Sequence, residues 1–139
     1  SLPMALVIGN LKRLELLRTR PELKEKLWEN AKKLQTGLKS RGFDIGKTDS
    51  PVTPIYMTGG VEEATAMVMD LRENYHIFCS IVVYPVIPKG HIIYRLIPTA
   101  SHTDTDIEET LQAFDETKKR LDAGKYKTSA IPHMADVPA

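Results

Sequence analysis

Apolar residues recur every three or four positions through the first part of the chain, a spacing that predicts helices. We expect a first helix over residues 3–18 and a second over residues 21–40, with Gly42 as a natural stop. Pro21 lies at the break, where a proline is tolerated in the first turn of a new helix. The sequence leaves open whether these are two helices or one long bent helix.

Three shorter apolar stretches predict strands. The first covers residues 52–57, and Pro54 within it indicates an edge strand or a bulge. The second, residues 77–83, is an apolar, β-branched run, which is typical of a strand covered on both faces. The third covers residues 91–97.

Two further amphipathic helices complete the pattern. One is expected over residues 61–74, and another from a cap at Thr103 to about Asp122, with acidic residues in its first turns and basic ones at its end. The order helix, helix, strand, helix, strand, strand, helix predicts a small sheet covered by helices, an α/β (α+β) fold. Residues 123–139 have no apolar periodicity and are expected to form an extended tail.

Composition narrows the function classes. The 139 residues suit one domain, and 42% apolar with 27% charged residues is ordinary for a soluble globular protein. A net charge of +1 gives no reason to expect nucleic acid as a partner, and the four histidines lack metal-ligand spacing. No apolar run approaches the ~20 residues that cross a bilayer, and no signal-peptide pattern is present. We therefore expect a cytoplasmic protein without a metal.

Cys79 is the single cysteine, so an internal disulfide is impossible. It lies inside the apolar run 77–83 without an activating base in its sequence context. A buried structural thiol is therefore favoured over a nucleophile.

Arg95 is the candidate for chemistry, because it is a charge inside an apolar strand. Its neighbours predict a mostly buried position, where a charge must be paired. A guanidinium matches a carboxylate through two parallel hydrogen bonds. An internal salt bridge to Asp or Glu and a ligand carboxylate are equally compatible with this pattern.

The segments on either side of this strand supply further candidates. Pro85 and Pro88 stiffen the loop from Tyr84 to Gly90, which makes it a candidate substrate loop. After the strand, His102 is better explained as a structural histidine than as a base, and Thr99 as a turn residue.

Taken together, five short motifs in this order resemble the α-oxoamine synthases, a family that includes serine palmitoyltransferase, glycine C-acetyltransferase, 8-amino-7-oxononanoate synthase and 5-aminolevulinate synthase. The motifs are Ser1-Leu2-Pro3-Met4-Ala5, Leu27-Trp28-Glu29-Asn30, Gly42-Phe43-Asp44-Ile45-Gly46, Ser50-Pro51-Val52-Thr53-Pro54-Ile55, and the segment from Tyr84 to Thr103 that contains Arg95. The resemblance covers residues 1–122 and leans toward serine palmitoyltransferase.

The resemblance implies a fold and an organisation. Residues 43–122 would be the C-terminal small domain of a fold-type I aminotransferase-like enzyme, with a small, mostly antiparallel sheet covered by helices. Residues 1–42 would be the helical link from a large domain, and residues 123–139 a tail. The first helix is then expected to expose apolar surface, because its partner domain lies outside this chain.

The resemblance also implies a chemistry. Family members use pyridoxal 5'-phosphate (PLP) to join an amino acid, here serine or glycine, to an acyl-CoA, and they act as homodimers. Arg95 matches the family arginine that binds the substrate carboxylate. The lysine that holds PLP lies upstream of this segment, so the fragment is expected to bind no PLP and to be inactive alone. A glycine C-acetyltransferase, an 8-amino-7-oxononanoate synthase and a stand-alone amino-acid-binding regulatory module are the alternatives.

Overall fold

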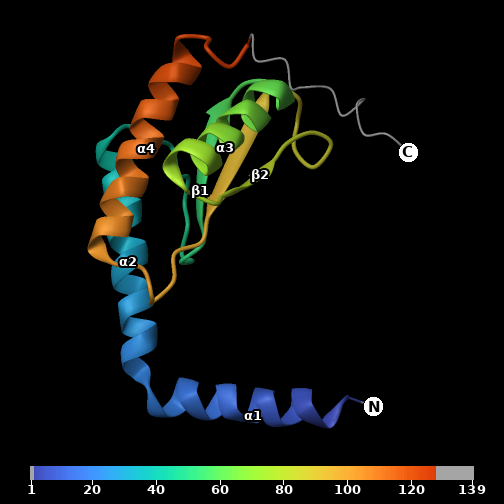
Figure 1. The fold of residues 1–139 in the computed structure, drawn as a ribbon, viewed down its shortest axis with the longest axis vertical. Coiled ribbons are helices and arrows are strands. Elements are labelled where there is room, and N and C mark those ends of the chain that lie inside the picture. The colour runs from blue at the N-terminus through green and yellow to red at the C-terminus, as the bar shows by residue number, and fades with distance from the viewer. Residues whose placement is uncertain (1, 128–139) are drawn as a thin grey trace.

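The computed structural model describes residues 2–127, which begin with two separate helices. Helix α1 covers Met4–Thr19 and α2 covers Pro21–Ser40. Arg20 between them has φ −128° and ψ 65°, outside the helical region, so the two helices are not continuous. Figure 1 shows α1 extending sideways from the foot of α2.

A three-stranded antiparallel sheet forms the centre of the domain, as the sequence predicted. Strands β1 (Thr53–Thr58), β2 (Ser80–Val82) and β3 (His91–Leu96) are arranged in the order β1-β3-β2. Strand β1 is therefore an edge strand, which confirms the expectation from Pro54.

Helices α2, α3 (Val61–Tyr75) and α4 (Asp104–Asp122) pack together and cover one face of this sheet (Figure 1). The core lies between them and the strands. The ring of Phe114 on α4 meets the rings of Phe43 and Tyr94 edge to face, each with centroids 6.1 Å apart. Thr103 caps α4 by accepting a hydrogen bond from the Asp106 amide, as predicted.

No helix in the described part of the chain covers the opposite face of the sheet, and this corrects two expectations. In β3, Ile92, Tyr94 and Leu96 are buried, whereas Arg95 between them is exposed. The run 77–83 yields only the three residues of β2, and Phe78 just before them is 81% exposed. These segments were expected to be covered on both faces. Instead β2 is an edge strand, and its apolar residues alternate between the core and the uncovered face.

The prediction of an extended tail is wrong for the residues directly after α4. Residues 123–127 form turns, and the ring of Tyr126 packs into the core. The Tyr126 hydroxyl donates a hydrogen bond to the carboxylate of Asp70 on α3. Residues 128–139 of the predicted tail lie outside the described residues.

Helix α1 differs from the others because none of its residues is buried. This confirms the expectation that the first helix exposes apolar surface. Its large apolar side chains are exposed, namely Met4, Leu6, Ile8, Leu11, Leu14, Leu16 and Leu17.

Cys79 is buried, as predicted for a structural thiol, and burial raises the pKa of that thiol to about 11. Among residues 2–127, no helix combines the length and the hydropathy that crossing a membrane requires.

Candidate functional site

Arg95 lies on the uncovered face of β3, the central strand. Its cross-strand neighbours are Pro54 on β1 and Ser80 on β2, each directly opposite in register. Side chains directly opposite in an antiparallel sheet share one face and are close together. Arg95 is thus held by a strand that is paired on both sides, while its side chain faces outward.

With the residues that the structure describes, the guanidinium of Arg95 makes one hydrogen bond, from Nε to the Ser80 hydroxyl oxygen at 3.1 Å. Within residues 2–127, no carboxylate oxygen lies within 4.0 Å of Arg95. The internal salt bridge, one of the two readings of the sequence, is therefore not formed by the described residues. A ligand carboxylate is compatible with this geometry.

The loop from Tyr84 to Gly90 lies at the other end of the β2–β3 hairpin. The amide of Val86 donates to the carbonyl of Val83 at 3.0 Å, and the Lys89 ammonium lies 5.0 Å from the centroid of the Tyr84 ring. Gly90 has a φ of 86°, which favours glycine, and its carbonyl accepts from the Gly59 amide at 3.1 Å. The loop is thus folded on itself and tied to the start of α3.

The structure does not bring this loop next to Arg95. The loop ends at Gly90, and β3 begins at His91, four residues before Arg95 and roughly 13 Å from it in an extended strand. Pro85 and Pro88 lie within the loop and so at the same far end of the hairpin.

Thr99 and His102 lie just past the Arg95 end of β3, in the connection to α4. The Thr99 amide donates to His102 Nδ1 at 3.0 Å, so this turn is closed by its own histidine. The acceptor nitrogen Nδ1 is therefore engaged within the turn.

Asn30 on α2 fixes the same turn and was missed by the sequence analysis. Its side chain is fully buried, and Nδ2 donates to the carbonyls of Thr99 at 2.9 Å and His102 at 2.8 Å. A signal was present, because Asn30 lies three residues after Leu27 and four before Leu34, on the apolar stripe of α2. A polar residue on such a stripe indicates a buried hydrogen-bonding role.

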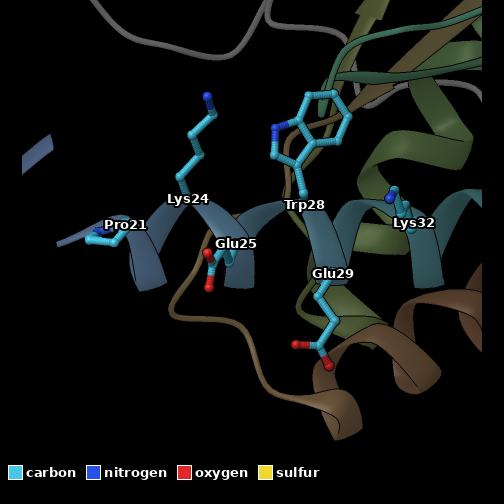
Figure 2. Close-up of a pocket in the computed structure, with 6 residues that line it drawn as sticks. All are labelled: Pro21, Lys24, Glu25, Trp28, Glu29 and Lys32. Carbon is cyan, nitrogen blue, oxygen red and sulfur yellow. The ribbon is translucent and has the colours of Figure 1, made fainter. Parts of the chain in front are cut away.

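Two of the surface hollows lie along α2 and beside the turn after β3. One, of about 590 Å³, adjoins the Thr99–His102 turn and is lined by Phe78, Ile97 and Pro98 among others. The other, of about 630 Å³, is lined by α2 alone (Figure 2). There Lys24 and half-buried Trp28 point to one side of the helix, and Glu29 points to the other. Neither hollow includes Arg95, and residues 2–127 contain no group of His, Cys, Asp and Glu side chains able to hold a metal ion.

The comparisons with known proteins agree on one family. The chain is 58% identical over 127 residues to a cysteate-C-fatty acyltransferase of Capnocytophaga ochracea, covering 91% of the chain and 30% of that protein. It is 37% identical to an 8-amino-7-oxononanoate synthase of Thermoanaerobacter pseudethanolicus, covering 87% of the chain and 30% of that protein. No protein-family model matches the chain.

The fold agrees with the sequence comparison. A structure of a serine palmitoyltransferase variant from S. paucimobilis, solved with PLP and myriocin, superposes with a TM-score of 0.76 at 27% identity. The match covers 88% of this chain and 31% of that one. The chain thus spans about 30% of the length of the curated relatives that it matches. The chain belongs to the α-oxoamine synthases and corresponds to their C-terminal domain.

Proposed function

We propose that this chain is the small domain of a PLP-dependent C-acyltransferase, and that Arg95 binds the α-carboxylate of its amino-acid substrate. The observation that carries the proposal is an arginine on an uncovered sheet face whose two Nη atoms have no hydrogen-bond partner among residues 2–127. A charge-assisted, two-point hydrogen bond to a carboxylate is the interaction for which a guanidinium is best suited. The family membership supports the same assignment.

The proposed substrates are an acyl thioester such as acyl-CoA and a small amino acid. The 58% identical relative is named for cysteate, which makes cysteate the first candidate. Serine is the second, because serine palmitoyltransferase structures share the fold at 27% identity. Glycine is the third. All three amino acids carry the α-carboxylate that Arg95 would bind, so the choice among them depends on contacts to the side chain.

PLP would supply the electron sink that stabilises a carbanion at the amino acid's α-carbon. The chain offers an arginine for the substrate and an uncovered sheet face, both of which fit a role as one wall of such a site. We assign no residue of this chain to the cofactor. The orientation of the substrate is the contribution that these residues make, since a fixed carboxylate fixes which bond at the α-carbon can react.

The domain organisation follows the same family pattern in this proposal. Residues 1–42 would link this domain to a PLP-binding domain, and the exposed apolar side chains of α1 support such a contact. Residues 43–122 would form the small domain, and the loop Tyr84–Gly90 would border the substrate site in the assembled enzyme. A homodimer is proposed from the family resemblance. A cytoplasmic location is proposed from the single, buried thiol.

The test uses the native protein that contains this chain, loaded with PLP and given palmitoyl-CoA with L-cysteate, L-serine or glycine in turn. Release of the CoA thiol is followed colorimetrically, and the product is identified by mass spectrometry. We expect thiol release that depends on the amino acid and is fastest with cysteate. If no thiol is released with any of the three amino acids, the proposed activity is contradicted. A preference for serine or glycine would contradict only the choice of cysteate.

A further inference from the structure

We propose that Ser80 is a positioning residue that determines which edge of the Arg95 guanidinium meets the substrate carboxylate; this inference rests on the proposed function. The hydroxyl oxygen of Ser80 accepts a hydrogen bond from Arg95 Nε at 3.1 Å, and the two residues are directly opposite each other on β2 and β3. Ser80 is therefore placed by the sheet register itself.

The donor geometry of arginine explains how this contact affects substrate binding. A guanidinium has five N–H donors in one plane, one on Nε and two on each Nη. A carboxylate can bind two parallel donors either on the side that includes Nε or at the end formed by both Nη atoms. Because Ser80 occupies Nε, the end formed by the two Nη atoms stays available for a two-point contact.

The surroundings of Arg95 make Ser80 the relevant side chain. The opposite cross-strand neighbour, Pro54, has no polar side-chain atom. The strand neighbours Tyr94 and Leu96 point into the core. In the part of the chain that the structure describes, Ser80 is thus the side chain that forms a hydrogen bond with Arg95.

A long arginine side chain that is exposed loses rotamer freedom when it binds a ligand, and this loss costs affinity. The Ser80 hydroxyl restricts the guanidinium before the substrate arrives. Substrate binding then requires less ordering, so the contact acts on affinity for the amino acid rather than on the acyl donor.

The experiment compares Ser80→Ala, Ser80→Thr and Ser80→Val in the PLP-loaded native protein. Thr keeps the hydroxyl, and Val has nearly the same shape as Thr without it. We expect Ala and Val to raise the KM for the amino acid by roughly five- to thirtyfold, as for one lost hydrogen bond to a charged group. Thr is expected to stay within about threefold of the parent, and the KM for acyl-CoA to stay unchanged in all three.

A double-mutant cycle separates positioning from a general structural role. If Ser80 acts through Arg95, Ser80→Ala causes no further rise in the amino-acid KM once Arg95 is replaced by Gln. Equal KM values for the parent, Ala and Val proteins would overturn the inference, as would additive effects in the cycle. These outcomes presuppose thiol release by the parent protein, whose complete absence would instead overturn the proposed function on which the inference rests.

Discussion

The two faces of the same three strands have opposite characters. On the face toward α2, α3 and α4, β3 contributes Ile92, Tyr94 and Leu96, all buried in the core. On the other face the same strand presents Arg95, which is exposed and lacks an acidic partner among the described residues. The period of two along a strand makes this separation possible within three consecutive residues.

This contrast separates stability from binding. Buried apolar area is the main favourable term in folding, so the covered face determines whether the domain folds. An exposed arginine adds little to that term. Replacements on the covered face should therefore change the free energy of unfolding, and replacements on the uncovered face should change substrate binding at nearly constant stability.

Replacing Phe114 by Ala should have the largest effect. Its ring is fully buried and contacts two other aromatic rings, and truncating such a residue removes about 3–5 kcal/mol of stability. The matched control is Phe78→Ala just before β2, where the ring is 81% exposed and the expected change is within about 0.5 kcal/mol. Urea unfolding of both variants measures the difference. Similar losses for the two phenylalanines would contradict the assignment of Phe114 to the core that stabilises the fold.

Replacing Asn30 by Leu should have the next largest effect. The carbonyls of Thr99 and His102 would lose their buried donor, at a cost of about 1–3 kcal/mol in the free energy of unfolding. Asn10→Leu on α1 is the control, because Asn10 is exposed and its expected effect is within about 0.5 kcal/mol. Asn30→Leu as stable as the parent protein would show that the turn after β3 does not depend on this amide.

Replacing Asp70 by Asn should lower the free energy of unfolding by a smaller amount that depends on pH. Burial pushes the pKa of Asp70 upward, but hydrogen bonds from Tyr126, Asn74 and Arg120 outweigh it and leave the pKa below its ordinary value. A lowered pKa means that the ionised form stabilises the fold, fully above the unfolded-state pKa and progressively less as pH falls through the folded-state value.

Asp70→Asn should therefore cost about 1–2 kcal/mol at pH 7, with the difference from the parent protein shrinking below about pH 4. The control is Asp49→Asn, at an exposed position. Unfolding curves at several pH values measure both. A loss that grows toward acid pH would reverse the sign of the linkage and contradict the account of this carboxylate.

Local patterns in the sequence predicted most helices and strands. The predictions that failed did so for physical reasons. Helix α2 was predicted with its observed bounds because its apolar stripe and both of its ends have clear signals. The run 77–83 was predicted too long and too buried, because periodicity cannot distinguish a strand with two covered faces from an edge strand with apolar residues on an open face. Tyr126 was missed because a single aromatic residue after a helix has no period to detect.

The candidate site shows the same division. Arg95 stands out in the sequence as a charge in an apolar strand, but its exposure follows from the sheet having one covered face, which is a tertiary property. The Ser80 contact depends on the pairing register of β2 with β3, which only the folded chain specifies. The loop Tyr84–Gly90 stands out through its two prolines, but its distance from Arg95 depends on the length of the strand between them, which the fold determines.

The most direct test of the account is a pair of measurements on one variant, Arg95→Gln, in the native protein. The central claim is that Arg95 binds the amino-acid carboxylate and does not hold the fold. We predict an amino-acid KM at least thirtyfold higher, as expected for a lost pair between charges, with an unchanged KM for acyl-CoA and a free energy of unfolding within about 0.5 kcal/mol of the parent. An unchanged amino-acid KM, or a loss of stability as large as that of Phe114→Ala, would contradict the claim.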